Sequence, residues 1–261
     1  MFRSTPPDTL AMKDYQPAAD LLKDRVILVT GASDGIGKEA AWTYARHGAQ
    51  LVLLGRSQNK LDRLASMIEH ETGLLPVAYA LDFLTAGPQE YHQLAEQLTS
   101  TFHRLDGLLL NAGILGTLGP LEQADPQEWQ QVQQVNVTAA LLLIQALLPL
   151  LRRSPAAAIL FTSSGVGRRG RANWGAYAVS KFATEGLMQV LADELATTHI
   201  RVNAINPGAT RTAMRAKARP DEDPGCLPTP ATLMPVYLYL MGNDGRSVHG
   251  QSVDAQPPRN G

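Results

Sequence analysis

The sequence of 261 residues contains one cysteine, few aromatic residues and no excess of charge of either sign. Cys226 cannot form a disulfide within the chain, which is typical of a reducing compartment, and we expect the protein in the cytoplasm. No His or Cys stands beside it, so we regard it as a free thiol and expect no metal site. A net charge of −1 provides no positive field, which argues against nucleic acid and anionic membranes as partners.

Long hydrophobic runs are also missing. The most apolar stretch, 139–151, is interrupted by Gln145 and Pro149, with Pro149 marking the expected helix end, and is too short to span a bilayer. The first residues are polar, contain Pro6, Pro7 and Pro17, and lack the apolar core of a signal peptide. We therefore expect an N-terminal extension over 1–24, and in 139–151 a buried helix that also contacts another subunit.

Apolar runs typical of strands alternate with helical patterns from residue 25 to 261. This alternation predicts a single-domain, doubly wound α/β Rossmann fold, with a parallel sheet covered by helices on both faces. An irregular lobe at 212–232 is rich in proline and charge, and we expect it to cover the substrate, as a moving lid rather than a rigid loop. The expected strands are 26–30, 50–55, 76–80, 105–110, 156–162, 200–205 and 251–254. The expected helices reach about 47 and then cover 57–71, 88–102, 126–150, 174–198 and 233–241.

A glycine-rich turn follows the first strand. Gly31, Gly35 and Gly37 stand between the strand and a helix, so the backbone can turn tightly and approach a pyrophosphate at the helix start. Ser33, Asp34 and Ile36 complete this predicted cofactor cradle. An ordinary strand-to-helix turn is the alternative, and Asp34, an anion in the loop, could serve by satisfying turn N–H groups.

Residues after the next three strands are further cofactor candidates. Arg56 follows the second strand where an acidic residue would bind a ribose hydroxyl, so we favour NADP(H) over NAD(H), with a solvated Arg as the alternative. Asp82 is placed to contact adenine or to cap the next helix. Asn111, Ala112 and Gly113 would let the backbone pass close to the ribose, although a plain turn would look the same.

Ser164, Tyr177 and Lys181 form the strongest chemical pattern. Tyr177 and Lys181 are four residues apart and share one helix face, and Ser164 ends a strand. Lowering a phenol pKa from ~10 to about 7 needs roughly 4 kcal/mol. A charge ~4 Å away at an effective dielectric of ~20 supplies about that much, so we predict that the lysine lowers the pKa of Tyr177. Chance spacing on a helix is the alternative.

Together these segments resemble the short-chain dehydrogenase/reductase family over about residues 20–255. The resemblance implies a seven-stranded sheet and hydride transfer between NAD(P)H and a carbonyl or alcohol. The matching motifs are TGASDGIG (30–37), NAG (111–113), Asn136 of VNV, Ser164, YAVSK (177–181) and PGATRT (207–212).

The same resemblance implies a role for each matching residue. Tyr177 would be the acid/base, Ser164 would orient the substrate oxygen, and Lys181 would hold the nicotinamide ribose. Asn136 would anchor a water that leads protons to Lys181. Pro207, Gly208, Thr210 and Thr212 would meet the nicotinamide amide and the pyrophosphate, and the family leads us to expect a homodimer or homotetramer.

Three segments resemble one bacterial subgroup of this family: 167–177, 207–216 and 253–257. The last ends in Asp254-Ala255-Gln256, where many family members have Asp-Gly-Gly. Arg168, Arg169 and Arg171 lie in the first segment. We hypothesise that one of them favours an anionic substrate, against the alternative of a solvated basic loop. A redox sensor or scaffold that binds NADP(H) without turnover remains the competing function.

Overall fold

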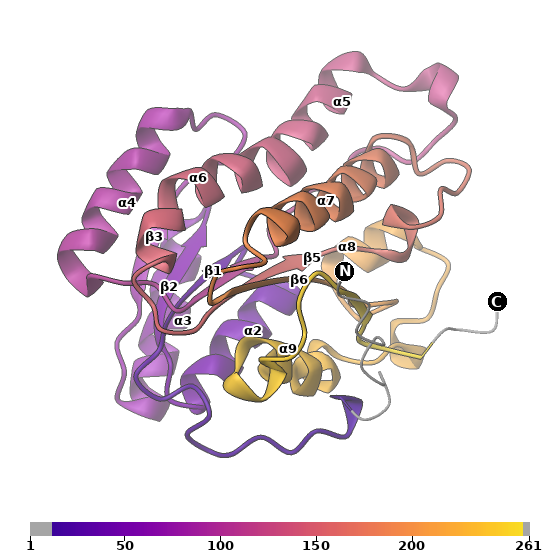
Figure 1. Ribbon diagram of the computed structural model, residues 1–261. Helices are drawn as coiled ribbons and strands as arrows, with labels where there is room; N and C mark the ends of the chain where they lie inside the picture. The colour runs from indigo at the N-terminus through magenta and orange to yellow at the C-terminus, as the bar shows by residue number, and fades with distance from the viewer. Residues whose placement is uncertain (1–11, 258–261) are drawn as a thin grey trace.

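The computed structural model describes residues 12–257, which fold around one parallel sheet of seven strands (Figure 1). The strand order is β3-β2-β1-β4-β5-β6-β7, so the direction of winding reverses between β1 and β4. This confirms the predicted doubly wound fold. The strands are β1 (Val26–Thr30), β2 (Gln50–Gly55), β3 (Val77–Ala80), β4 (Gly107–Leu110), β5 (Ala157–Thr162), β6 (Ile200–Asn206) and β7 (Ser252–Asp254).

Helices cover both faces of the sheet. In Figure 1, α2, α3 and α9 lie below it and α4, α6 and α7 above it. The helices are α2 (Gly35–Arg46), α3 (Gln58–Thr72), α4 (Pro88–Phe102), α5 (Pro126–Gln133), α6 (Ala139–Leu151), α7 (Gly175–Glu194), α8 (Ala213–Ala218) and α9 (Met234–Met241). Short 3-10 turns occupy Leu121–Gln123, Gly165–Gly167, Pro224–Cys226, Pro230–Leu233 and Asn243–Gly245.

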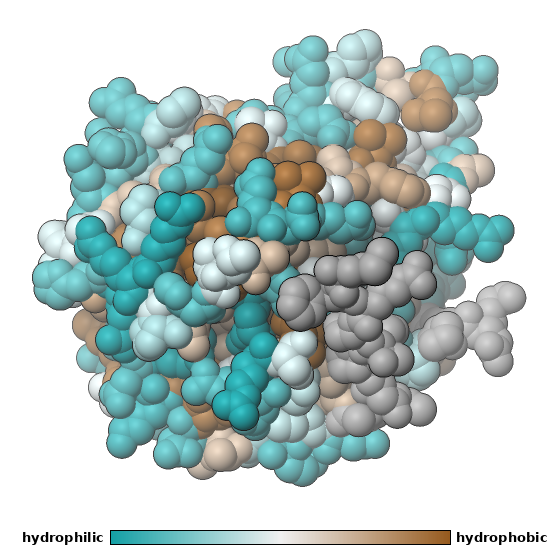
Figure 2. Space-filling model, viewed as in Figure 1, coloured by the Kyte–Doolittle hydropathy of each residue, from teal (hydrophilic) through white to brown (hydrophobic). Residues whose placement is uncertain are grey.

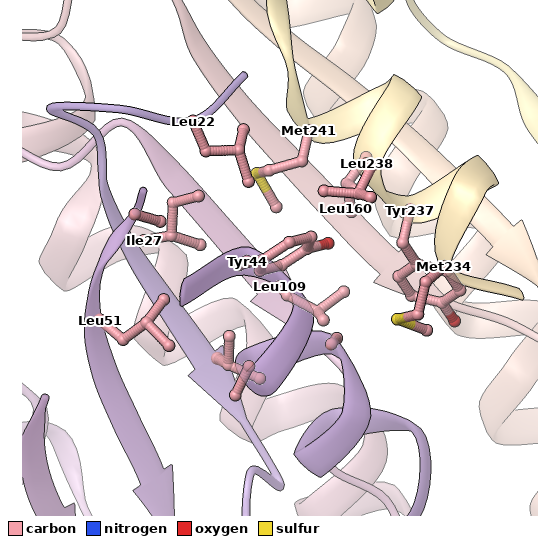
Figure 3. Close-up of a cluster of buried hydrophobic side chains, with 14 of the residues drawn as sticks. Leu22, Ile27, Tyr44, Leu51, Leu109, Leu160, Met234, Tyr237, Leu238 and Met241 are labelled. Atoms are coloured by element: carbon pink, nitrogen blue, oxygen red, sulfur yellow. The ribbon is translucent and has the colours of Figure 1, made fainter. Parts of the chain in front are cut away.

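The strand residues alternate between two separate cores. In β1, Ile27 and Val29 join the cluster beneath the sheet, whereas Leu28 joins the cluster above it. Successive side chains of a strand point to opposite faces, and both faces here are covered, so the strands read as continuous apolar runs. Figure 3 shows the lower cluster, in which Tyr44 of α2 lies near Leu109 of β4.

The region around 126–151 differs from the single regular helix that the sequence predicts. A π-helical turn, Gln134–Thr138, separates α5 from α6. Pro149 lies inside α6 and does not end it, because the helix continues to Leu151. The span Pro126–Leu151 has the length and the mean hydropathy, 1.8, that a membrane span would need, but a buried core helix meets the same criterion. Here Leu143 and Leu147 of α6 are fully buried in the upper core.

The described part of the N-terminal extension, 12–24, packs against the domain. Leu22 is fully buried, and its backbone N–H donates to the carbonyl of His47. The Tyr15 hydroxyl donates to Asp244, and its ring meets Tyr239 of α9 edge-on. Residues 12–24 therefore extend the lower core. Residues 1–11 lie outside the described part of the chain.

The predicted lobe at 212–232 has more order than expected. It contains α8 and two 3-10 turns. The Arg215 guanidinium binds the Glu222 carboxylate with two hydrogen bonds, and Arg211 donates to the carbonyls of Gly225 and Leu227. These contacts hold residues 211–227 together as one compact unit.

Candidate active site

The residues predicted for the site come together at one edge of the sheet. Parallel strands bring their carboxyl ends to the same edge, and side chains that follow different strands meet there. Gly31–Gly37 follow β1, Arg56 follows β2, Asp82 follows β3 and Asn111–Gly113 follow β4. Ser164 follows β5 and Pro207–Thr212 follow β6, while Tyr177 and Lys181 lie in the first two turns of α7.

The glycine-rich turn has space for backbone only. A Cβ on Gly37 would lie 2.3 Å from the carbonyl oxygen of Gly31 and 2.5 Å from Nδ2 of Asn111. Asp34 caps α2, since its Oδ1 accepts from the N–H of Gly35 at 2.7 Å. The turn therefore brings α2 close to β1, with the helix start at the strand edge, and this geometry fits the diphosphate of a dinucleotide.

The ends of β2 and β3 carry the residues predicted for the adenosine half. Arg56 is exposed, and Ser33 Oγ lies 3.6 Å from the position of a Cβ on Gly55. The Ser33 hydroxyl therefore lies beside Gly55, the residue before Arg56, and a hydroxyl and a guanidinium both suit a phosphate. Asp82 accepts from the N–H of Leu84 at 3.0 Å.

Asp82 does not cap a helix, which corrects one of the two alternatives for this residue. Helix α4 starts later, at Pro88, and its capping residue is Gly87. The N–H of Gly87 donates to Glu90 Oε2 at 2.9 Å. The Asp82 carboxylate therefore stabilises the turn after β3, and contact with adenine stays a prediction.

Thr30 holds the end of β4, a role that the motif alone did not reveal. Its Oγ1 accepts from the backbone N–H groups of Asn111 and Ala112, both at 2.9 Å, and donates to the carbonyl of Leu109. The side chain of Asn111 in turn accepts from Thr162 Oγ1 and donates to the Thr30 carbonyl. These bonds link β1, β4 and β5 at the site. The signal that could have revealed this role is the polar Thr30 at the end of an otherwise apolar strand.

Tyr177 lies within an apolar cluster and has the polar side chains of Ser164 and Lys181 nearby. Its side chain is 8% exposed and packs with Leu115 and Val166, and the Trp174 ring lies 5.9 Å away. Burial raises the pKa of Tyr177 to about 12, while a hydrogen bond with Ser164 acts to lower it. The phenol is therefore protonated at neutral pH.

This result contradicts the prediction that Lys181 alone would bring the phenol pKa near 7. Lys181 Nζ donates to the carbonyl of Thr162 at 2.7 Å and lies 5.6 Å from the centre of the Tyr177 ring. Burial lowers the pKa of Lys181 to about 8, and Glu185 opposes that shift. The sequence argument omitted desolvation, which here outweighs the attraction between charges.

Asn136 lies in the π-helical turn and is 5% exposed. Its Oδ1 accepts from the N–H of Ile114 at 2.8 Å, and Nδ2 donates to the Ile114 carbonyl and to Ser180 Oγ, both at 2.9 Å. Both N–H groups of the amide are therefore occupied by protein. These contacts give the side chain a positioning role between β4 and α7.

The turn after β6 faces the glycine-rich turn. Thr212 Cγ2 lies 3.4 Å from the position of a Cβ on Gly35. Thr212 also caps α8 by accepting from the N–H of Arg215. The predicted contact segment 207–212 thus borders the cradle from the side opposite β2.

Arg168 is not available to an anionic substrate, contrary to one form of the hypothesis for the three arginines. It donates two hydrogen bonds of 2.9 Å to Asp254 and one of 3.0 Å to Ser252. Arg169 and Arg171 are exposed. Because the guanidinium of Arg168 is already paired with a carboxylate, the hypothesis of an arginine that binds an anionic substrate now concerns only Arg169 and Arg171.

A groove of about 480 Å³ opens next to the Tyr177 cluster. Leu118, Trp174 and Ala218 belong to its lining and also pack against that cluster. Arg219, at the end of α8, adds one guanidinium. Among residues 12–257, no group of three or more His, Cys, Asp or Glu side chains could hold a metal ion.

A parallel doubly wound sheet with this turn and this Tyr, Ser and Lys set defines the class of dinucleotide-dependent oxidoreductases. The family model described as short chain dehydrogenase matches residues 25–223. The chain is 60% identical over 245 residues to the oxidoreductase YciK of Escherichia coli K12, an alignment that covers 94% of this chain and 97% of YciK. The chain belongs to the short-chain dehydrogenase/reductase family, which confirms the resemblance.

Solved structures agree with this assignment. A short-chain dehydrogenase of Shigella flexneri complexed with NADP is 59% identical, with a TM-score of 0.90, and covers 92% of this chain and 100% of its own. A short-chain dehydrogenase of E. coli complexed with NADPH is 60% identical, with a TM-score of 0.91, and has the same coverage. The bacterial subgroup indicated by segments 167–177, 207–216 and 253–257 is the YciK type.

Proposed function

We propose that the protein is an NADP(H)-dependent oxidoreductase that transfers a hydride between nicotinamide and a carbonyl or alcohol, with Tyr177 as the acid/base. The observation that carries this proposal is the buried Tyr177 phenol, hydrogen-bonded with Ser164 and within 5.6 Å of the Lys181 ammonium. All three lie at the sheet edge where dinucleotides bind in this fold.

The 2′-phosphate of NADP(H) would be held at the end of β2. Ser33 Oγ lies beside Gly55, the residue before Arg56, and Arg56 occupies the place of the acidic residue that would favour NAD(H). The complexes of the two similar dehydrogenases with NADP and NADPH support the same preference. The cradle at Gly31–Gly37 would hold the diphosphate.

The chain's own residues would supply proton transfer and orientation. When bound, NADPH supplies the hydride to the carbonyl carbon of the substrate. Tyr177 holds its proton at neutral pH, because its pKa is about 12, and donates it to the carbonyl oxygen. Ser164 Oγ orients that oxygen. Lys181, with a pKa of about 8, stays charged at pH 7 and stabilises the phenolate that forms.

The groove beside Tyr177 would hold the substrate. Its Leu118, Pro120 and Trp174 suit an apolar body, and the lobe at 212–232 borders it through Ala218 and Arg219. We propose that this lobe closes over the substrate as a unit, since Arg215 pairs with Glu222 within it and Arg211 bonds to the carbonyls of Gly225 and Leu227.

A homo-oligomer is proposed from the upper face of the molecule, and a cytoplasmic location stays a prediction from the cysteine content of the sequence. Leu141 of α6 and Val179, Phe182 and Val190 of α7 are exposed although they are apolar. Figure 2 shows an apolar area over the part of the molecule where Figure 1 places α6 and α7. Such patches mark association sites. Sedimentation should show a dimer or tetramer, and Phe182→Glu should shift it towards monomer.

Tyr177→Phe tests the proposed function. The variant should bind NADPH with unchanged affinity, measured by cofactor fluorescence. It should also lose turnover by orders of magnitude against a panel of aldehydes, ketones and alcohols followed by NADPH absorbance. Turnover equal to that of the unchanged protein would refute the role of Tyr177. A sensor or scaffold would instead show no turnover in either protein, although the intact Ser164, Tyr177 and Lys181 argue against that alternative.

A further inference from the structure

Gln256, two residues after β7, is bonded to the turn after β6. Its Nε2 donates to the carbonyl of Pro207 at 2.6 Å, to the carbonyl of Ala209 at 3.0 Å and to Thr210 Oγ1 at 3.1 Å. The two amide hydrogens thus serve three oxygen atoms of one four-residue turn. This residue stands where many family members have glycine.

The turn is shaped around that side chain. Gly208 has a φ of +69°, and a Cβ there would lie 3.1 Å from Cδ of Gln256. Asn206 Oδ1 accepts from the N–H of Gly208 at 3.1 Å, and Asn206 Nδ2 donates to Asp254 Oδ1 at 2.6 Å. The conformation of 207–210 therefore depends on contacts from the segment 252–256.

The same segment also reaches the catalytic serine side. Asp254 receives both hydrogen bonds from Arg168, which directly follows the 3-10 turn after Ser164. Ser252 Oγ donates to Glu185 at 2.8 Å, and Glu185 also accepts from Ser163. The segment 252–256 therefore joins the turn after β5 to the turn after β6. Its contact Glu185 lies one helical turn after Lys181 on α7.

We propose that Ser252–Gln256 is a positioning segment that fixes these two turns relative to one another, and that Gln256 is its positioning residue for the nicotinamide half of the cofactor. The inference rests on the proposed function, because that function places the nicotinamide against 207–212. The chain continues from this turn to Thr212, which borders the cradle at Gly35. Loosening the turn should therefore weaken contacts to one half of the dinucleotide only.

The test compares two ligands on full-length protein. NADPH spans both halves of the site, whereas adenosine 2′-monophosphate has no diphosphate and reaches only the half at Arg56. Gln256→Ala should weaken NADPH binding about tenfold, because binding must then order a turn that has lost one or two neutral hydrogen bonds, and it should leave binding of the fragment unchanged. Gln256→Glu keeps the length but replaces the N–H donors by a carboxylate, and it should weaken NADPH at least as much.

Gln251→Ala is the matched control. Gln251 directly precedes the segment, and its side chain donates to the carbonyl of His249, away from the turn. The control should bind both ligands as the unchanged protein does, and circular dichroism should show that all variants are folded. Equal weakening of both ligands by the two Gln256 variants, or no weakening of NADPH, would overturn the inference while leaving the proposed function intact. Failure of the unchanged protein to bind NADPH would overturn both.

Discussion

The side-chain Nδ2 of Asn136 donates a hydrogen bond of 2.9 Å to the hydroxyl of Ser180, the residue before Lys181. The π-helical turn makes this contact possible. A wider turn displaces one residue from the regular helical spacing, and such turns occur frequently at functional sites. The same amide pairs with both backbone groups of Ile114. Asn136 thereby connects the end of β4 to the helix that carries Tyr177 and Lys181.

Asn136→Ala should lower the free energy of unfolding by about 1–3 kcal/mol, because the part-buried backbone groups of Ile114 and the buried hydroxyl of Ser180 lose a hydrogen-bond partner. It should also lower kcat, since α7 loses a contact beside Lys181. Urea denaturation and steady-state kinetics measure the two effects. Gln134→Ala is the control in the same turn, because its side chain makes one bond of 3.3 Å to Phe83. Equal effects of the two substitutions would contradict the prediction.

Arg56→Ala should weaken the binding of NADPH by about 10–100-fold, because a charge-assisted bond to the 2′-phosphate is lost. The affinity for NADH should stay nearly unchanged. Titrations that follow cofactor fluorescence give both dissociation constants. Arg63→Ala, on the exposed face of α3, serves as the control. A parallel loss for both cofactors would show that Arg56 does not read the phosphate.

Lys181→Met should remove a cost of about 3 kcal/mol at pH 7, because burial lowers the lysine pKa from 10.5 to about 8, and the loss of the donor to the Thr162 carbonyl offsets about 1–3 kcal/mol of that gain. Between pH 8 and 10 the unfolded chain binds more protons at this lysine than the folded chain does. The stability of the unchanged protein should therefore rise with pH in this window, and the variant should lack that rise.

Above pH 10 the raised pKa of Tyr177, about 12, acts in the opposite direction, so the comparison is confined to lower pH. Chemical denaturation of both proteins at several pH values measures the difference. Lys60→Met, an exposed lysine, should leave the pH profile unchanged. Identical profiles for the unchanged protein and Lys181→Met would refute the assignment.

Gly37→Ala should abolish NADPH binding and destabilise the fold by about 1–3 kcal/mol or more, since the new methyl group overlaps the Gly31 carbonyl. Gly170→Ala is the control, because a Cβ there meets nothing within 4 Å. Thermal unfolding and cofactor titration measure both properties. Normal binding by Gly37→Ala would mean that the turn is not a tight cradle.

Much of the fold was predictable because its causes are local. Apolar runs separated by helical periodicity predicted the seven strands, and strand ends in a parallel sheet must share one edge. For the same reason Gly31, Arg56, Asn111 and Ser164 could be assigned to one site. The π-helical turn was not predictable, because a regular helix and a widened one have almost the same sequence pattern.

The sequence by itself determined the order of the elements and the residue types that meet at the site. Only the tertiary structure decided which charges are already paired and how each group titrates. Arg168 reads as a free basic residue but is bound by Asp254, eighty-six positions away. Desolvation raises the pKa of Tyr177 and lowers the pKa of Lys181. It depends on the atoms that surround the two side chains in space, and their spacing along the helix does not reveal it.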